Sequence, residues 1–242
     1  KKTGTKEGCA EGGCGACSVV LGELKNNKIN YSAVNSCIMF LPTLQRKQLI
    51  IVEDLISKDG LLHPVQQAMV NYHGSQCGFC TPGFVMSLFS MFKNHSKFQD
   101  NEIKESIAGN LCRCTGYQPI IKAARSLKRK NKIDHFVKNK KITISLLKKI
   151  EDENIAIYEK DKRYFAPKYV QELKKILKKN IDANFLSGGT DLSLTVTKAR
   201  KDIRSIIYMN SISELNYIKN NNKYIEVGAS TPLIELELYI KK

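Results

Sequence analysis

All eight cysteines of this 242-residue chain lie in its first half, and they form two sets of four. The first set has the spacing C-x4-C-x2-C with a separate fourth cysteine, and the second is a C-x2-C pair followed by a C-x-C pair. Four thiolates complete the ligand set of an iron–sulfur cluster, and the first spacing is that of plant-type [2Fe–2S] proteins. We therefore predict two electron-transfer centres, one on Cys9, Cys14, Cys17 and Cys37 and one on Cys77, Cys80, Cys112 and Cys114.

Other uses of eight cysteines fit these spacings less well. A structural zinc site also takes four thiolates, and a C-x2-C pair alone is typical of zinc or of a redox dithiol. Four disulfides would suit a small secreted domain, whereas this chain is long and its cysteines cluster at metal-ligand spacings. A zinc-stabilised interaction protein is therefore the alternative of another class, and free thiols favour a reducing, cytoplasmic compartment.

The first three cysteines lie in a glycine-rich segment, residues 8–17. Three thiolates can converge on one small diiron unit only if the backbone turns tightly around it. Glycine permits the left-handed and crowded conformations that such a turn needs. We therefore expect Gly12, Gly13 and Gly15 to shape the loop and not to bind metal.

The elements that must hold the two quartets differ in kind. Residues 1–60 predict a small β-rich module with strands over residues 18–24, 27–34 and 48–52. Residues 62–127 predict four helices, because apolar residues recur at helical spacing behind prolines that suit the first turn of a helix. These prolines are Pro64, Pro82 and Pro119, and the remaining helix, over residues 102–108, can be capped by Asp100 or Asn101.

The second half of the chain contains no cysteine and has a different pattern. A basic linker is predicted over residues 128–142. Beyond it we expect an amphipathic helix and short strands, which is an α+β arrangement. The helix covers residues 170–177, and the strands cover residues 185–186, 206–208 and 224–227.

The composition excludes some classes of protein. The net charge is +16, but the lysines are spread along the whole chain, so we expect a solvated basic surface and no specific nucleic-acid binding. The sequence contains no run of eighteen apolar residues, so no membrane span is predicted. The N-terminus does not resemble a signal peptide. The chain lacks an initial methionine and opens directly into the cysteine loop, so we expect a sequence truncated at both ends.

Four sequence motifs together carry a family resemblance. They are GCAEGGCGACSVV at residues 8–20, VNSC at 34–37, QCGFCTPG at 76–83 and NLCRCTGY at 110–117. In this order they resemble the molybdenum hydroxylase family, which includes xanthine dehydrogenases and aldehyde oxidases. The resemblance implies a β-grasp ferredoxin-like domain over residues 1–60 and a four-helix domain over 61–127, each with one [2Fe–2S] cluster on the quartet named above. Gln76 matches a glutamine that approaches the pterin of the molybdenum cofactor in that family.

A turn with two glycines, LSGGTDL, lies in the cysteine-free half. Backbone N–H groups of such a turn can cradle a pyrophosphate, although a surface hairpin has the same composition. Together with the segments at residues 164–167 and 227–231, it resembles the start of the family's α+β FAD-binding domain of the PCMH type, here over residues 143–242. The FAD contacts that this resemblance implies are Leu186, Ser187, Gly188, Gly189, Thr190, Asp191 and Leu192.

The order of the three modules predicts an α+β multidomain oxidoreductase subunit that transfers electrons. It resembles the small subunit of bacterial xanthine dehydrogenases. The resemblance implies that a purine is oxidised at a molybdenum–pterin centre on a partner large subunit, and that electrons pass through both clusters to FAD and NAD. The reductase chain of an aldehyde or N-heterocycle hydroxylase is the alternative. We expect no catalytic residue in this chain, because its four histidines sit apart without a motif.

Overall fold

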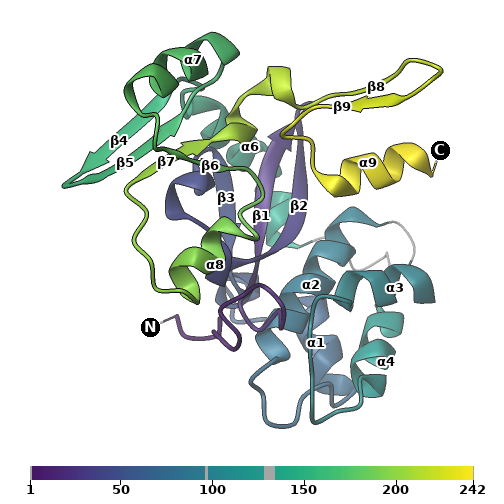
Figure 1. Cartoon of the computed structure of the whole chain (residues 1–242). Helices are drawn as coiled ribbons and strands as arrows, with labels where there is room; N and C mark the ends of the chain where they lie inside the picture. Colours follow the sequence, from purple (N-terminus) through teal and green to yellow (C-terminus); the bar gives the residue numbers. More distant parts are fainter. Residues whose placement is uncertain (1, 96–97, 128–133, 242) are drawn as a thin grey trace. The chain divides into compact units, whose positions relative to one another are not determined.

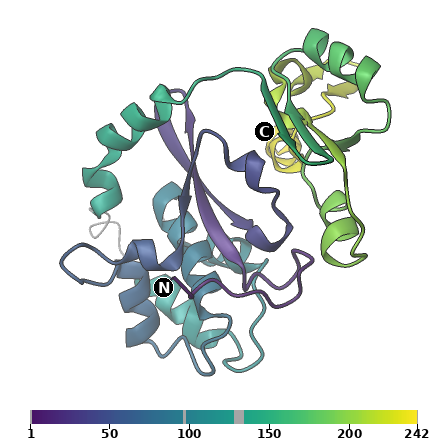
Figure 2. The same ribbon diagram turned by 90° about the vertical axis from the view of Figure 1, so that its left-hand side faces the viewer.

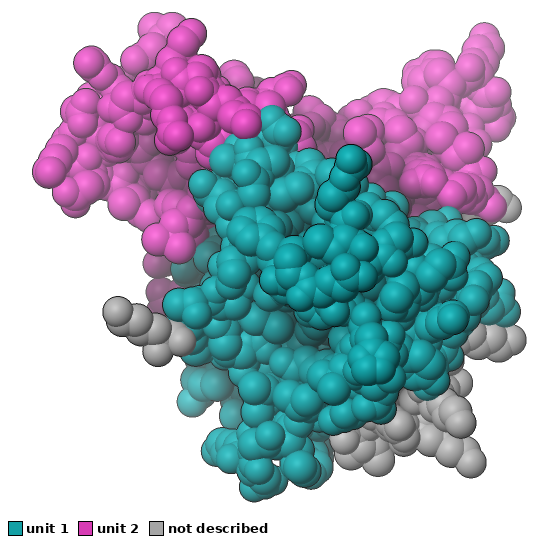
Figure 3. All heavy atoms as spheres, turned by 90° about the horizontal axis from the view of Figure 1, so that it is seen from below, with its two compact units in different colours: residues 1–39, 44–150 teal, residues 40–43, 151–242 magenta. Residues whose placement is uncertain are grey.

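The computed structural model describes residues 2–95, 98–127 and 134–241. The chain divides into two compact units, which Figure 3 shows in different colours. Unit 1 comprises Lys1–Met39 and Leu44–Ile150, and unit 2 comprises Phe40–Thr43 and Glu151–Lys242. Within the part of the chain that the structure describes, no helix has the length and apolar character that a membrane crossing requires.

Unit 1 begins with a three-stranded antiparallel sheet in the order β2-β1-β3. Its strands are β1 (Ser18–Lys25), β2 (Lys28–Asn35) and β3 (Lys47–Ile50). The turn between β1 and β2 places Asn26 and Asn27 at φ values of 49° and 58°, which is typical of a tight two-residue hairpin. The predicted hairpin is confirmed. The third strand ends at Ile50, because Val52–Leu55 form a 3-10 helix.

Four helices follow, as predicted, and they gather at one end of this sheet (Figures 1 and 2). They are α1 (Pro64–Asn71), α2 (Thr81–Asn94), α3 (Asp100–Ile107) and α4 (Gln118–Ser126). The expected cap of α3 is wrong by one residue. Gln99 is the capping residue, and its backbone N–H donates to the Glu102 carboxylate at 2.8 Å, which places Asp100 inside the first turn.

The sheet and the helices of unit 1 share one hydrophobic core. Helix α2 is buried from Gly83 to Phe92 and packs against β1 and β2. Its side chains Phe84, Phe89 and Phe92 are fully inaccessible to solvent. Because a helix that is apolar on all sides must be covered on all sides, α2 is the central element on which the rest of unit 1 packs.

The predicted linker over residues 128–142 lies inside unit 1, which extends to Ile150. Residues 128–133 of that linker are outside the described residues, and the rest contains α5 (His135–Lys138) and the start of α6 (Lys140–Lys149). The Asp134 carboxylate caps α5 by accepting a hydrogen bond from the Val137 N–H at 2.8 Å. Phe136 and Ile144 pack on the core of unit 1, so both helices belong to this unit.

Unit 2 has a four-stranded sheet in the order β4-β5-β7-β6, in which β4 pairs antiparallel and the other pairs are parallel. The side chains of β5 alternate between two small cores. Tyr164 and Ala166 join one core, whereas Phe165 joins the other together with Leu173 of the helix α7. The strands are β4 (Ile155–Glu159), β5 (Lys162–Ala166), β6 (Asn184–Leu186) and β7 (Ser205–Tyr208), and α7 is Val170–Lys179.

The remaining elements of unit 2 are small. They are α8 (Leu192–Thr197), the hairpin β8 (Ile218–Asn220) and β9 (Ile225–Val227), and α9 (Leu233–Ile240). The predicted helix at 170–177 and the predicted strands are confirmed to within two residues, whereas β4, β5, β8, α8 and α9 were not predicted. The predicted α+β character of this half is confirmed.

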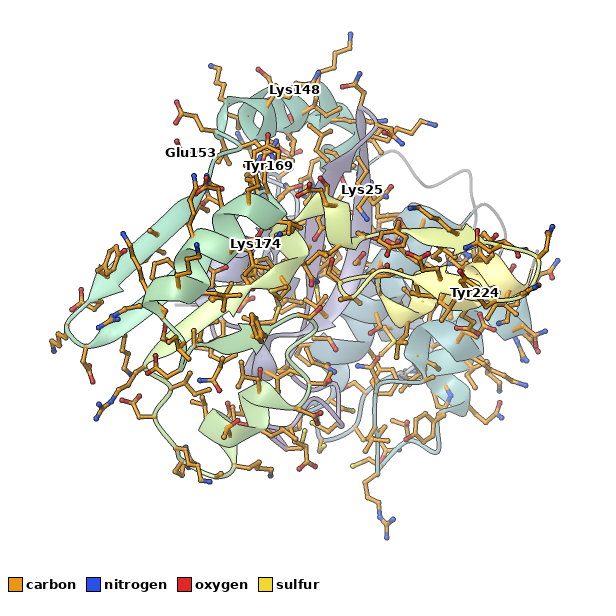
Figure 4. The ribbon with its side chains drawn as sticks, turned by 45° about the horizontal axis from the view of Figure 1, so that its top comes forward. Lys25, Lys148, Glu153, Tyr169, Lys174 and Tyr224 are labelled. Carbon is orange, nitrogen blue, oxygen red and sulfur yellow. The ribbon has the colours of Figure 1, made fainter. Side chains whose placement is uncertain are left out.

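The lysines lie on the surface of many elements. Figure 4 labels Lys25 at the end of β1, Lys148 on α6 and Lys174 on α7, and all three side chains are exposed. This distribution agrees with the expectation of a solvated basic surface.

Candidate metal centres and nucleotide loop

The glycine-rich loop at residues 8–17 turns around the sulfur of Cys9. The backbone N–H groups of Gly13 and Cys14 donate to Cys9 Sγ, each at 3.3 Å. Gly12 and Gly15 have φ values of 76° and 69°, so both adopt the left-handed conformation that was expected of them. A methyl group on Gly13 would meet only Glu11, at 3.8 Å, so neither space nor a left-handed φ demands glycine there.

The fourth thiol of the first quartet comes from the 3-10 turn Ser36–Ile38, directly after β2. Asn35 holds this turn against the loop, because its Nδ2 donates to the Gly12 carbonyl at 2.6 Å. Ser36 Oγ donates to the Cys17 carbonyl at 2.8 Å. These contacts bring Cys37 to the loop, and the sequence had not indicated Asn35 as the residue responsible.

The thiols of the first quartet interact in pairs. Burial acts to raise the pKa of Cys9, but hydrogen bonds from neighbouring backbone N–H groups and from the Cys14 thiol outweigh it and lower this pKa to about 7. Burial, followed by a hydrogen bond with Cys17, raises the pKa of Cys37 to about 12. Cys9 therefore lies in hydrogen-bond contact with Cys14, and Cys37 with Cys17.

The second quartet is distributed around the starts of two helices. Cys80 is the N-cap residue of α2, and Cys112 and Cys114 lie in the loop between α3 and α4. Burial and a hydrogen bond with Cys112 raise the pKa of Cys80 to about 12. A backbone N–H hydrogen bond and then the thiol of Cys114 lower the pKa of Cys77. In the second quartet, Cys80 therefore lies in hydrogen-bond contact with Cys112, and Cys77 with Cys114.

The donor set of each quartet fits a [2Fe–2S] cluster. Such a cluster takes four thiolates, which each quartet could supply. A structural zinc ion also takes four thiolates, so metal analysis must separate the two. Within residues 2–95, 98–127 and 134–241, no group of three or more His, Cys, Asp or Glu side chains is arranged to hold one metal ion. The assignment of the eight ligands stays a prediction.

The two cysteine loops meet at Asn110, which is 3% exposed. Its Nδ2 donates to the Gly15 carbonyl at 3.1 Å and to Ser18 Oγ at 3.3 Å. Its Oδ1 accepts a hydrogen bond from Ser87 Oγ at 2.6 Å. Because each of these atoms is buried, the Asn110 side chain fixes the first loop against α2 and the second loop.

A backbone hydrogen bond also joins the two loops. The Leu111 N–H donates to the Cys14 carbonyl at 2.9 Å. Leu111 is bonded directly to Cys112, so a single hydrogen bond connects a residue of the first quartet to a neighbour of the second. Space is tight at this junction, because a methyl group on Gly83 would lie 2.1 Å from the Gly15 carbonyl oxygen.

The LSGGTDL segment of unit 2 runs from the end of β6 to the start of α8, so the predicted strand-to-loop turn is confirmed. Gly189 has a φ of 85°, and its carbonyl accepts from the Ser193 N–H at 2.9 Å. Ser187 Oγ donates to Asn210 Oδ1 at 2.7 Å. Among the described residues, nothing lies within 4 Å of a methyl group placed on Gly188, which leaves room for a ligand to approach the backbone. The FAD contacts at residues 186–192 stay a prediction.

Gln76 lies beside Cys77 in the loop before α2, and its side chain is exposed. This position leaves it accessible to a partner molecule. Its proposed contact with a pterin stays a prediction.

Two family models match the chain. A [2Fe-2S] binding domain matches residues 51–125, and the FAD binding domain in molybdopterin dehydrogenase matches residues 157–242. The xanthine dehydrogenase of Emericella nidulans is 32% identical over an alignment that covers 97% of this chain and 20% of that protein. The chain belongs to the molybdenum hydroxylase family. It corresponds to the iron–sulfur and FAD-binding regions of the family's members.

Other molybdenum hydroxylases match parts of the chain. Aldehyde oxidase 1 of Oryctolagus cuniculus is 44% identical over 126 residues, which is 51% of this chain and 9% of that protein. Quinoline 2-oxidoreductase from Pseudomonas putida 86 superimposes with a TM-score of 0.44 at 33% identity, covering 51% of this chain and 71% of that one. The chain thus spans 20% or less of the two curated relatives.

Proposed function

We propose that this chain is the electron-transfer part of a molybdenum hydroxylase, with one [2Fe–2S] cluster on each cysteine quartet. The observation that carries this proposal is the arrangement of the eight cysteines in loops of unit 1 that meet at the hydrogen bond from the Leu111 N–H to the Cys14 carbonyl and at the buried Asn110 side chain. When bound, the clusters supply one-electron carriers. The contribution of the protein is to hold them close together and to surround their sulfurs with donors.

The residues of unit 1 have distinct tasks in this proposal. The thiolates bind iron, and the N–H groups of Gly13 and Cys14 stabilise negative charge at Cys9. Asn110 and Leu111 keep the two loops at a constant separation, and electron transfer between carriers depends strongly on that separation. No nucleophile or general base is required of this chain.

The finer proposal concerns the substrate and the acceptor. We favour a xanthine dehydrogenase, in which a purine is oxidised at a molybdenum–pterin centre on a large partner subunit, with Gln76 facing the pterin. FAD would bind at residues 186–192 of the domain over 143–242 and pass electrons to NAD in the cytoplasm. Support comes from the xanthine dehydrogenase relative, which aligns with 97% of the chain, including both family regions.

A hydroxylase of aldehydes or N-heterocycles is the second candidate, because aldehyde oxidase 1 is 44% identical over half of the chain. The substrate pocket lies outside the regions matched here, so the substrate must be tested directly. The protein is purified anaerobically together with its molybdenum-containing partner. Bleaching of the cluster absorbance by xanthine supports the first candidate, and bleaching only by an aldehyde or N-heterocycle supports the second.

Metal analysis of the purified chain tests the electron-transfer proposal itself. Two [2Fe–2S] clusters require about four iron and four acid-labile sulfide per chain, a reddish-brown colour and two reduced-state EPR signals. A colourless protein that contains two zinc ions per chain would overturn the proposal in favour of a zinc-stabilised interaction protein.

A further inference from the structure

Two polar groups of one residue, Thr115, lie beside the sulfur of Cys112. Thr115 Oγ1 lies 3.1 Å from Cys112 Sγ, and the Thr115 backbone N–H donates to the same sulfur at 3.5 Å. Thr115 directly follows Cys114 in the motif NLCRCTGY, and the sequence did not single it out as a site residue. The second quartet therefore has a polar side chain, Thr115, in contact with the sulfur of one of its predicted ligands.

The direction of the Thr115 hydrogen bond follows from its other contact. Thr115 Oγ1 accepts a hydrogen bond from the Tyr117 N–H at 3.2 Å, so its own O–H hydrogen is available for another acceptor. A metal-bound Cys112 is a thiolate without a proton, and its sulfur can only accept. In the loaded protein the Thr115 hydroxyl is therefore the donor to Cys112 Sγ.

The loop that presents Thr115 is anchored to the core. The Tyr117 hydroxyl accepts the Cys112 N–H at 3.0 Å, and Tyr117 adopts a left-handed φ of 67° at the start of α4. Its ring packs edge-on against Phe84, which is fully buried, with 6.1 Å between ring centroids. Because both ends of the turn are held, the hydroxyl keeps one orientation toward the sulfur.

The first quartet has a different environment. Cys9 Sγ accepts from backbone N–H groups, at 3.3 Å from Gly13 and Cys14. The polar side-chain atom near Cys17 Sγ is Asn35 Oδ1, at 3.9 Å, and an oxygen without hydrogen cannot donate to a thiolate. A side-chain hydroxyl thus lies beside Cys112 Sγ, whereas the contacts described above for Cys9 and Cys17 include no hydroxyl.

We propose that the Thr115 hydroxyl raises the reduction potential of the cluster on the second quartet. This inference rests on the proposed function. A reduced cluster carries one more negative charge than an oxidised one, so a donor to its thiolate stabilises the reduced form more strongly. Thr115 acts through Cys112 and is a positioning residue that carries no electron itself.

Potentiometric EPR titration of the purified, cluster-loaded chain tests this inference. Thr115→Val keeps the shape of the side chain but removes the hydroxyl, and it should lower the equilibrium constant for reduction of the second cluster about tenfold, which is about 59 mV for one electron. The first cluster should keep its potential. Thr115→Ser should restore the potential, and Thr143→Val on α6, far along the chain from both quartets, should change neither.

The outcomes separate the inference from the proposed function. Wild-type protein without iron–sulfur signals overturns the proposed function. Loaded Thr115→Val protein with unchanged potentials, or with both potentials shifted equally, overturns the inference alone. If Thr115→Val does not load its second cluster, Thr115→Ala and Thr115→Ser are compared instead. Equal second-cluster potentials in these two variants, or failure of Thr115→Ala to load, overturn the inference in favour of a purely structural role.

Discussion

In the first quartet, three cysteines lie within nine consecutive residues, and Cys9 accepts hydrogen bonds from the backbone of their loop, whereas the second quartet joins two pairs more than thirty residues apart. Cys17 of the first is 2% exposed, and Cys77 and Cys114 of the second are exposed. The first is therefore organised by local backbone conformation. The second depends on the packing of α2, α3 and α4.

This difference has a physical consequence. A local loop loses little chain entropy when its cysteines converge, because few residues separate them. The second quartet requires folded helices before its two pairs can meet. We therefore expect the second quartet to respond more strongly to changes in helix packing, and the following experiments test this comparison.

The largest effect is expected from replacing one ligand. Cys114→Ser should remove one of the two reduced-state EPR signals completely and leave the other, because a cluster that lacks one thiolate ligand of the second quartet is not retained. Cys9→Ser is the matched variant and should remove the other signal. If both signals persist at full intensity in Cys114→Ser, the second quartet has been assigned wrongly.

The next effect concerns a buried charge cluster that supports the helices. His63 Nε2 lies 3.0 Å from Asp134 Oδ2, and Lys93 Nζ lies 3.0 Å from both Asp134 oxygens. All three side chains are buried: His63 is 1% exposed, Asp134 is 3% exposed and Lys93 is 7% exposed. Asp134→Ala leaves the Lys93 ammonium buried without its partner, so the free energy of unfolding should fall by about 3–5 kcal/mol.

Urea denaturation of the loaded protein measures this change. Asp100→Ala is the control, because Asp100 forms an exposed ion pair with Arg125 and its loss should have little effect. Equal stability losses in the two variants would contradict a supporting role for the buried cluster.

A smaller effect is expected where the two loops meet. Gly83→Ala places a methyl group 2.1 Å from the Gly15 carbonyl oxygen, so the first loop must shift away from α2. Overpacking of this kind costs about 1–3 kcal/mol, and both EPR signals should broaden or shift. Gly109→Ala is the control, since no described atom lies within 4 Å of its added methyl group. A change confined to one signal would show that the junction does not couple the quartets.

The smallest effect is a dependence of stability on pH. Burial lowers the pKa of His63 below its ordinary value of 6.5, although Asp134 opposes this. Below pH 6.5, His63 therefore binds a proton more readily in the unfolded chain than in the folded protein. The contribution of neutral His63 to stability is complete above pH 6.5 and declines as the pH falls. The slope is at most about 1.4 kcal/mol per pH unit.

Burial acts to raise the pKa of Asp134, but His63 and Lys93 outweigh it and lower this pKa to about 2. The contribution of the Asp134 carboxylate to stability is therefore lost only between pH 3.8 and 2.

Denaturation at about pH 7.5 and about pH 5.5, on either side of the ordinary histidine pKa, measures the His63 contribution. His63→Gln should flatten the decline between these two values, whereas His73→Gln, which changes an exposed side chain, should retain it. Identical slopes for the wild type and His63→Gln would show that another group causes the decline.

Several features could be read directly from the residues. The spacing of the first quartet, the Asn26-Asn27 hairpin and the helices that begin near Pro64, Pro82 and Pro119 depend on a few consecutive residues. The helices over residues 135–149 were missed in part because their lysine-rich sequence also fits a linker. The β4–β5 hairpin was missed because both strands are short and β4 is largely exposed, which leaves no clear alternation of apolar and polar residues there.

The sequence by itself determined the two quartets of thiols that could bind metal and the local turn that holds the first three, since both depend on residue type and near-neighbour backbone geometry. Tertiary structure alone decided that Asn110 would hold Gly15, that His63 would meet Asp134, and that Leu111 would meet Cys14. These partners are separated by 95, 71 and 97 residues. Their meeting depends on how buried helices pack, which no short stretch of sequence encodes.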